Sequence, residues 1–344
     1  METKKDQQFT IRDVAKLAGV STATVSRALN GREDVNARTR QKILKIAKDY
    51  NFRPNAAGRG LSMRKTFTIG VAIPDLRSSY FAEVILGVDE VAGERGYSTV
   101  IYNTGYIEDR EREALRMVRD RRMDGMIMLL SNRLTDECRA LVDMGYNVVL
   151  LGNALENVDC PSVACNNFAS AYVIVEYLIK NGHTRIAHIG GNRDTNTGML
   201  RMQGFMKAME NYGIPVNPAW NLPTRYFKDE AYSMMKRIIA SGDLPTAVYA
   251  AADTMAIGCY KAIYEAGLRI PDDFSIVGHD DIDIASLVYP PLTTMRQQTR
   301  EMGKTAARKL LDGFSTRPRK DITILPTSLV ARQSVKDLSR GAKG

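Results

Sequence analysis

Hydrophobic residues recur at helical spacing in three short segments near the start of the chain. This spacing predicts helices over residues 11–18, 22–29 and 37–50. Thr10 and Ser21 are suited to cap the first two helices, and Gly19 permits a tight left-handed turn between them. We expect eight apolar side chains to form a small core among these helices: Val14, Leu17, Val20, Val25, Ala28, Leu29, Ile43 and Leu44.

The pattern changes after a polar, glycine-bearing connector, NAAGRGLSMRK. Strands are then expected over residues 67–73, 97–103, 125–130, 147–151, 185–190, 246–251 and 274–278. Helices are expected near residues 80–95, 108–122, 135–144, 167–181, 198–212, 229–240 and 253–267. Such alternation predicts parallel sheets covered on both faces. The fold class is therefore an N-terminal all-α helix-turn-helix head (1–52), a hinge (53–66) and an α/β body of two doubly wound lobes (67–344).

The net charge of +9 is concentrated in the predicted head and hinge. Residues 1–66 hold 15 Lys and Arg against 6 Asp and Glu, whereas the rest of the chain holds 33 of each sign. A basic module attached to a neutral body indicates a polyanionic partner. The second predicted helix is short enough for the major groove of DNA, and its segment STATVSR is rich in hydroxyls. Ser21, Thr24 and Ser26 can donate to phosphates, and Arg27 can reach a base or a phosphate.

Composition argues against several other classes of protein. No apolar run approaches the roughly 18 residues of a membrane helix, and the first ten residues are too polar for a signal peptide, so we expect a cytoplasmic protein. The three histidines are widely spaced and the cysteines lack CxxC spacing, so neither a metal site nor a cofactor is expected. Four free thiols are expected instead: Cys138, Cys160, Cys165 and Cys259.

The segment TIRDVAKLAGVSTATVSRALNG, with VNARTRQKILKIAKDYNFRPNAAGRGL after it, resembles the head and hinge of the lactose-repressor (LacI/GalR) family of bacterial transcription regulators. Further motifs follow in the family's order, among them GVAIPD, MDGMIML, NGHTRIAHIGG, PTAVYAAADTMAIG and PPLTTMRQ. The resemblance covers about residues 9–335 and implies a periplasmic-binding-protein-like body.

The resemblance also implies a role for particular positions of the head and hinge. Thr22 and Ala23 would discriminate between bases. Other residues would support this helix or contact phosphates: Thr10, Ser21, Thr24, Ser26, Arg27, Asn30, Asn36 and Thr39. Asn55 would open the hinge, and Leu61 would insert into the minor groove at the centre of the operator and kink the duplex.

Two α/β lobes predict a ligand cleft between them. By resemblance to the family and to periplasmic sugar-binding proteins, Tyr80 and Phe81 would form an aromatic wall of an effector site. Five further residues would complete it: Thr197, Arg201, Tyr226, Asp280 and Gln297. Arg201 would donate hydrogen bonds to the effector and Asp280 would accept them.

Two classes of effector are expected. A sugar or a sugar derivative comes first on family grounds, although Gly152-Asn153 and Ala252-Asp253 depart from polar pairs that many sugar-responsive members carry. A nucleoside or a purine comes second, because Tyr80, Phe81 and Tyr226 can stack on a planar base. A regulator that answers to a partner protein and a small-molecule-binding α/β enzyme are the alternatives. The sequence lacks the GxGxxG, GxxxxGK[ST] and GxSxG motifs, so we expect no enzyme.

One head contacts too few base pairs for specificity, so we expect a homodimer on a pseudo-palindromic DNA operator. The resemblance implies that the helix after Ser79, with Val84, Val88 and Val91, contributes to the dimer interface. It further implies that an effector between the lobes changes operator affinity. The hinge departs from the family pattern at Gly58 and adds a second flexible residue at Gly60; each glycine costs a helix about 1 kcal/mol relative to alanine.

Overall fold

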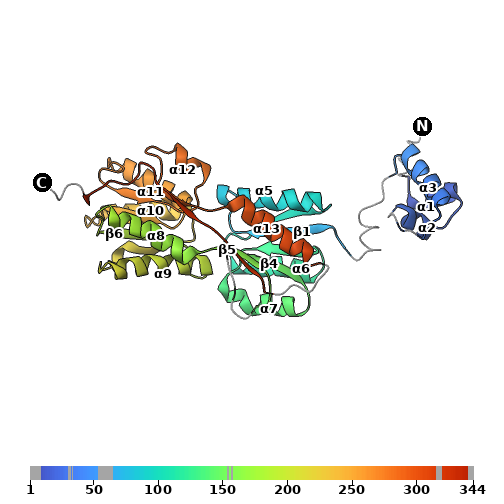
Figure 1. Ribbon diagram of the computed structural model, residues 1–344, viewed down its shortest axis with the longest axis horizontal. Coiled ribbons are helices and arrows are strands. Elements are labelled where there is room, and N and C mark those ends of the chain that lie inside the picture. The colour runs from blue at the N-terminus through green and yellow to red at the C-terminus, as the bar shows by residue number, and fades with distance from the viewer. Residues whose placement is uncertain are drawn as a thin grey trace, which may run out of the picture. The chain divides into compact units, whose positions relative to one another are not determined.

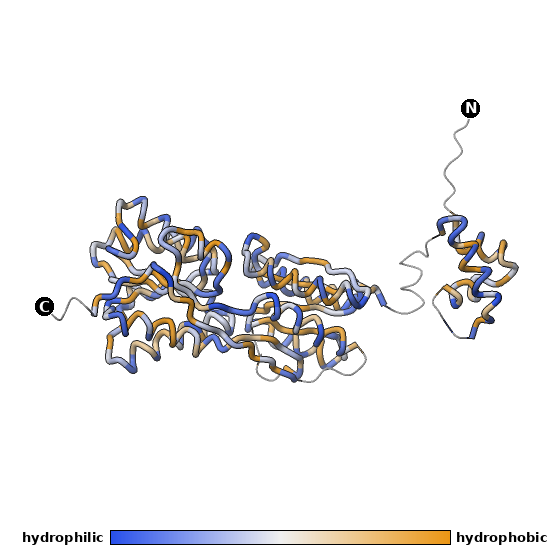
Figure 2. The backbone as a smooth tube through the Cα atoms, turned by 45° about the horizontal axis from the view of Figure 1, so that its top comes forward, coloured by the Kyte–Doolittle hydropathy of each residue, from blue (hydrophilic) through white to orange (hydrophobic). Residues whose placement is uncertain are grey.

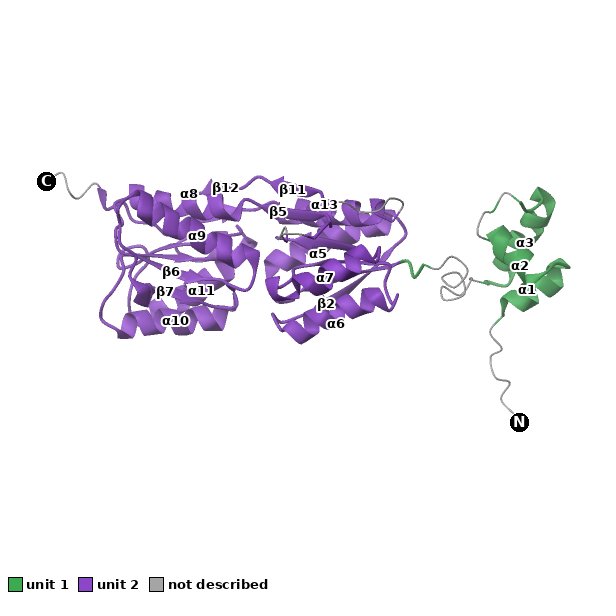
Figure 3. Cartoon of the chain, turned by 90° about the horizontal axis from the view of Figure 1, so that it is seen from below, with its two compact units in different colours: residues 1–67 green, residues 68–344 purple. Residues whose placement is uncertain are grey.

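The computed structural model describes residues 9–29, 32, 34–52, 65–152, 155, 158–314 and 320–339. These residues form two compact units, Met1–Phe67 and Thr68–Gly344 (Figure 3). The first unit is the helical head and the second is the α/β body, whose elements are labelled in Figure 1. No helix in these ranges is both long enough and apolar enough to cross a membrane.

The head consists of α1 (Ile11–Ala18), α2 (Thr22–Leu29) and α3 (Ala37–Asp49), as the hydrophobic spacing predicts. The Asp13 carboxylate accepts both the backbone N–H (2.8 Å) and the hydroxyl (2.7 Å) of Thr10, and these bonds lower its pKa. Gly19 ends α1 in the left-handed conformation at φ +74°. A side-chain capping box therefore marks the start of α1, and a left-handed glycine marks its end.

The core of the head differs in membership from the set that the sequence predicts. Val14, Val25, Ala28 and Ile43 are buried as expected, but Leu17 and Leu44 are 46% and 48% exposed. These two predictions are wrong because Ala18 and Ile43, one position away on their helices, occupy the inward face instead. Val20 and Leu29 are partly buried and pack against the core. Hydrophobic and hydrophilic positions follow one another along the helices of both units (Figure 2). This mixture is typical of helices that bury one face.

The first lobe of the body, called lobe 1 here, contains a six-stranded parallel sheet of order β11-β5-β4-β3-β1-β2. Its strands are β1 (Thr68–Ile73), β2 (Ser98–Asn103), β3 (Gly125–Met128), β4 (Asn147–Leu151), β5 (Ser162–Cys165) and β11 (Ile322–Leu325). Its helices are α5 (Ser79–Glu94), α6 (Glu108–Arg119), η1 (Asn132–Leu134), α7 (Thr135–Asp143) and α13 (Thr299–Asp312). Helices α5 and α13 cover one face of the sheet, and α6 and α7 cover the other (Figure 1).

Lobe 2 contains a four-stranded parallel sheet of order β7-β6-β8-β9 and a two-stranded antiparallel ribbon, β10-β12. Its strands are β6 (Ile186–Gly190), β7 (Asn221–Pro223), β8 (Ala247–Ala250), β9 (Ser275–Val277), β10 (Thr294–Arg296) and β12 (Ser328–Val330). Its helices are α8 (Asn167–Lys180), α9 (Asn196–Asn211), η2 (Pro218–Trp220), α10 (Lys228–Ala240), α11 (Asp253–Glu265) and α12 (Asp283–Leu287). Both lobes are thus doubly wound, as predicted.

The chain passes between the lobes three times. It crosses from β5 to α8, returns from β10 to α13, and crosses again from β11 to β12. Several elements of the body were not predicted from the sequence, among them β5, β7, β10, β11, β12, α12 and α13. Most of these segments carry three to five residues, too few for a periodic pattern. Lobe 1 is therefore completed by segments that follow lobe 2 in the chain.

Candidate DNA-binding head and effector cleft

Helix α2 presents the predicted base-discriminating residues on its exposed side. Thr22 and Ala23 are exposed, whereas Val25 and Ala28 of the same helix are buried in the head's core. Ser21 accepts a hydrogen bond from the Thr24 backbone N–H (3.1 Å), so it caps the start of the helix. This arrangement holds two short side chains on an exposed helix face.

Thr10 lies at the start of α1, and the other described DNA-contact residues lie on or beside α2 or at the start of α3. Arg27 is paired with Asp34 across 3.1 Å, and both side chains are about half exposed. Asn36 caps α3 by accepting from the Arg38 backbone N–H (2.9 Å), and Thr39 lies in the first turn of that helix. Ser26 lies in the middle of α2 and is partly buried. Three predicted contacts, Asn30, Asn55 and Leu61, and the two hinge glycines lie outside the described residues.

A cleft between the two lobes is lined by residues from both of them. All seven residues predicted for the effector site line it: Tyr80, Phe81, Thr197, Arg201, Tyr226, Asp280 and Gln297. Other lining residues were not predicted from the sequence, among them Tyr106, Cys165, Asn167, Phe227 and Met302. These residues carry no motif, and the fold alone brings them to the cleft.

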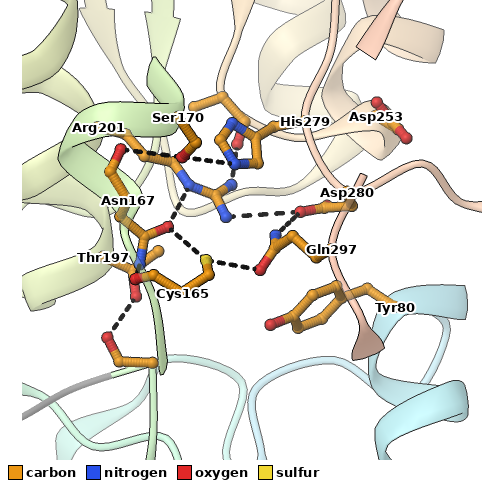
Figure 4. Close-up of polar contacts among 12 residues, drawn as sticks. Tyr80, Cys165, Asn167, Ser170, Thr197, Arg201, Asp253, His279, Asp280 and Gln297 are labelled. Carbon is orange, nitrogen blue, oxygen red and sulfur yellow. Dashed lines mark hydrogen bonds and ion pairs between the residues drawn. The ribbon is translucent and has the colours of Figure 1, made fainter. Parts of the chain in front are cut away.

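Buried polar side chains form the floor of the cleft (Figure 4). Arg201, 3% exposed, donates from Nε to Asn167 Oδ1 (2.9 Å) and from Nη1 to the Ala251 carbonyl oxygen. Its Nη2 lies 3.5 Å from Asp280 Oδ1, which also accepts from Gln297 Nε2 (2.6 Å). The guanidinium is therefore fixed in position before any effector binds.

Burial and charge act in opposite directions on this pair. Burial raises the pKa of the Asp280 carboxyl above its ordinary value, while the neighbouring Arg201 and the Gln297 hydrogen bond oppose the increase and favour the carboxylate. Burial alone would lower the pKa of Arg201, but the neighbouring Asp280 raises it above its ordinary value. A ligand that donates to Asp280 or accepts from Arg201 therefore enters a site of low dielectric constant. Each hydrogen bond there is electrostatically stronger than it would be in water.

Aromatic rings form the walls of the cleft. Tyr80 and Phe81 of α5 meet edge to face at 5.0 Å between ring centroids. Tyr106 of lobe 1 stacks on Tyr226 of lobe 2 at 6.0 Å, and its ring meets Phe227 at 5.8 Å. The Tyr226 hydroxyl is buried and has no hydrogen-bond partner within the described part of the chain. Such a wall offers flat faces and one unused polar group.

Backbone strain is concentrated around the same cleft. Tyr106, Tyr226 and Asp280 adopt positive φ values of 56°, 69° and 125°, which residues with a Cβ rarely adopt. Asp281 follows at φ 59°, and its carboxylate pairs with Arg296 (2.6 Å) and Arg332 (2.7 Å). Strained positions that persist at a cleft indicate a functional constraint there.

The lobes touch each other beside this cleft. Asn132 donates its backbone N–H to the Asp194 carbonyl oxygen (2.8 Å), and Arg133 pairs with the Asp194 carboxylate (3.1 Å). The Thr197 hydroxyl donates to the Gly152 carbonyl oxygen (3.1 Å). These contacts join the two lobes beside the cleft.

The structure corrects one expectation about the body, which concerns the dimer interface. Val84, Val88 and Val91 are buried between α5, α13 and the sheet of lobe 1, so they cannot lie on a dimer interface. Asp253 does not line the cleft: it accepts from the Thr294 hydroxyl (2.6 Å) and the Ile282 backbone N–H (3.0 Å). In the described ranges, no group of three or more His, Cys, Asp or Glu side chains could hold a metal ion.

Comparison with known proteins gives concordant results for both units. Residues 10–55 match the family described as bacterial regulatory proteins, lacI family, and residues 175–335 match a periplasmic binding protein-like domain. The HTH-type transcriptional repressor PurR of Vibrio vulnificus is 35% identical over 333 residues, which are 96% of this chain and 99% of the relative. PurR of Histophilus somni is equally similar, with the same coverage.

Two solved structures extend the comparison. The Lac repressor dimer bound to operator and an anti-inducer is 28% identical, with a TM-score of 0.83, and the match covers 96% of this chain and all of that one. A LacI family regulator from Enterococcus faecium with bound ribose is 28% identical, with a TM-score of 0.66 and coverage of 79% and 99%. This chain therefore belongs to the lacI family of bacterial regulatory proteins, and it is a DNA-binding transcription regulator.

Proposed function

We propose that this regulator represses transcription as a homodimer on a pseudo-palindromic operator, under the control of a planar nitrogen heterocycle bound between its lobes. Within the head, Thr22 and Ala23 discriminate between bases, while Arg27 and the capping residues position the helix. The exposure of Thr22 and Ala23 on a helix anchored by Val25 supports this division. Asn30, Asn55 and Leu61 keep their proposed roles on the resemblance alone.

Selection of bound sequences from random DNA tests the proposal for the head. Thr22→Ala is expected to relax base preference at one operator position while leaving the salt dependence of binding unchanged. Arg27→Ala is expected to weaken binding to every sequence and to reduce the salt slope, because it removes a phosphate contact. An unchanged preferred operator in Thr22→Ala would show that the recognition positions are misassigned.

The dimer interface is assigned to exposed apolar residues in place of the buried valines. Leu86 of α5 and Val100 and Ile101 of the edge strand β2 are 41–46% exposed, and Tyr289 of lobe 2 is 84% exposed. Sedimentation velocity of Ile101→Lys should show dissociation at concentrations at which Met144→Lys, another exposed apolar position of lobe 1, stays dimeric. Equal sedimentation of both variants as dimers would place the interface elsewhere.

The effector proposal rests on the pairing of Arg201 with Asp280 between aromatic walls. A purine base or its nucleoside presents donors and acceptors on one edge and two flat faces, which such a site can contact together. Relatives named PurR support this class, and the ribose-bound relative supports a sugar as the second candidate.

The proposal includes no catalytic step, because the relatives with matching length are repressors, and it places the protein in the cytoplasm with its DNA.

A thermal-shift panel on the full chain separates these candidates. Guanine, hypoxanthine, adenosine, cytidine, ribose and glucose are added to the protein in turn. A ligand at 100 times its Kd adds about 2.7 kcal/mol, which shifts the Tm by several degrees. A shift with a base or nucleoside supports the proposal, a shift with ribose or glucose alone transfers it to sugars, and no shift with any compound contradicts it.

A further inference from the structure

Five buried side chains at the floor of the cleft form a closed ring of polar contacts (Figure 4). Cys165 Sγ donates to Gln297 Oε1 (2.9 Å), and Gln297 Nε2 donates to Asp280 Oδ1 (2.6 Å). Arg201 joins Asp280 (3.5 Å) to Asn167 Oδ1 (2.9 Å), which lies 3.5 Å from Cys165 Sγ and closes the ring. All five side chains are at most 7% exposed, so water competes little for these contacts.

Three members of the ring lie where the chain crosses between the lobes. Cys165 ends β5 and Asn167 begins α8, so both lie on the first crossing. Gln297 lies between β10 and α13, on the second crossing. The other two, Arg201 and Asp280, belong to lobe 2 and are the charged groups that an effector meets. The ring therefore joins the charged groups to both crossing segments.

The Cys165 thiol and the Asp280 carboxylate together favour one orientation of the Gln297 amide. Because the S–H donates to Oε1, the Nε2 group is turned toward Asp280, where it can donate. With the amide reversed, Oε1 would face the Asp280 carboxylate and two acceptors would oppose each other. Burial raises the pKa of the Cys165 thiol, so it keeps the proton that it donates.

We propose that Cys165 and Asn167 are positioning residues of the effector site, Cys165 acting through Gln297 and Asn167 through Arg201, and that they connect effector binding to the two crossing segments. Neither residue has to contact the effector for this role. The inference rests on the proposed effector function for its ligand, but its second readout needs no ligand.

Serine and alanine at position 165 test the role of the thiol. Titration calorimetry measures the affinity for guanine and for every other panel compound that the wild type binds. Cys165→Ala removes the donor and is expected to weaken binding about 3- to 10-fold, the value of one hydrogen bond. Cys165→Ser supplies an O–H in its place and should restore most of the affinity, which a packing role would not predict.

Cys259 provides the matched control, because it is also fully buried but packs in the apolar core of lobe 2. At position 259 serine should be the worse replacement, because its hydroxyl would be buried among apolar side chains. We therefore expect Cys259→Ser to lower the Tm more than Cys259→Ala, and neither variant to change the effector affinity. In the Gln297→Ala background, Cys165→Ala should add less than a 2-fold effect, because the residue through which it acts is gone.

Hydrogen–deuterium exchange of the ligand-free full chain gives the second readout. The Asn132 amide bonds to Asp194 across the lobes, so its exchange reports opening. Exchange should be about 3- to 10-fold faster in Cys165→Ala and restored in Cys165→Ser. If the wild type binds no panel compound, the proposed effector fails and exchange alone decides the positioning role. Equal exchange and equal affinity in the wild type and both Cys165 variants would overturn it.

Discussion

The two lobes face the same cleft with different chemistry. Lobe 1 contributes mainly aromatic and aliphatic side chains, including Tyr80, Phe81 and Met302. Lobe 2 contributes the charged pair Arg201 and Asp280. An effector that lies between them meets aromatic rings of both lobes but finds the Arg201–Asp280 pair on lobe 2, so its binding requires both lobes.

This difference arises at equivalent places in two similar sheets. In each sheet the first strand, β1 or β6, lies between the second and the third, so the connections on its two sides run in opposite directions. Ligands of open α/β sheets bind at this point, beside the helix that follows the first strand. In lobe 1 the first turn of that helix carries Tyr80 and Phe81, and in lobe 2 the helix carries Thr197 and Arg201. The same fold position has therefore acquired an apolar role in one lobe and a polar role in the other.

The largest predicted effect concerns how lobe 1 is held together. A Cβ at Gly87 of α5 would lie 2.1 Å from the Arg300 carbonyl oxygen of α13, so Gly87→Ala must separate the two helices. We expect a loss of about 3 kcal/mol in unfolding free energy, measured by denaturant titration. Gly93→Ala on the same helix meets no atom within 4 Å and should instead gain up to about 1 kcal/mol. Equal stability of the two variants would mean that α13 does not constrain lobe 1.

The second prediction concerns the negative charge of the Arg201–Asp280 pair of lobe 2. Asp280→Asn can still accept from Gln297, but it leaves the buried Arg201 without its ionic partner. We expect effector affinity to fall about 10- to 100-fold, the value of a hydrogen bond to a charged group. Asp281→Asn is the control, because Asp281 pairs with Arg296 and Arg332 and lies outside the cleft lining. Unchanged calorimetric affinity in Asp280→Asn would show that the effector binds elsewhere.

The third prediction concerns a buried acid of lobe 1. Glu111 is 2% exposed and accepts the Ser131 backbone N–H (2.8 Å), and burial raises its pKa from 4.5 to about 7. Its protonated form is therefore favoured in the folded state, so its contribution to stability is complete below pH 4.5 and is lost as the pH rises through 7. Glu111→Gln should remove this loss, and its advantage over the wild type should grow by about 2 kcal/mol between pH 5 and pH 8.

Denaturant titrations at the two pH values measure the difference. Glu113→Gln is the control on the same helix, because Glu113 is more exposed and pairs with Arg116 (3.2 Å). A constant difference between Glu111→Gln and the wild type would show that the carboxyl titrates alike in the folded and unfolded states.

Both lobes contain elements that the sequence predicts and elements that it does not. Regular alternation of strands and helices predicted most elements of both lobes, because each such segment is long enough to show its period. The crossing segments escaped prediction because strands such as β5 and β10 have three or four residues. Tyr80 and Asp280 could be placed in the cleft through their motifs. Cys165 and Asn167 could not, because their role depends on contacts with residues that are distant in the sequence.

The smallest predicted effect uses the same substitution in both lobes. The Tyr80 hydroxyl of lobe 1 donates to the Met302 sulfur (3.4 Å), whereas the buried Tyr226 hydroxyl of lobe 2 has no partner within the described residues. If the Tyr226 hydroxyl bonds to the effector, Tyr226→Phe should lower effector affinity about 5- to 10-fold. The same change removes a buried polar group that lacks a partner, so it should raise the free energy of unfolding of the ligand-free protein by about 1 kcal/mol. Tyr80→Phe should change both quantities little, because a thioether is a weak acceptor. Calorimetry and denaturant titration of the two variants provide the measurements. A loss of affinity in Tyr80→Phe with none in Tyr226→Phe would assign hydrogen bonding to lobe 1 and reverse the division of roles between the lobes.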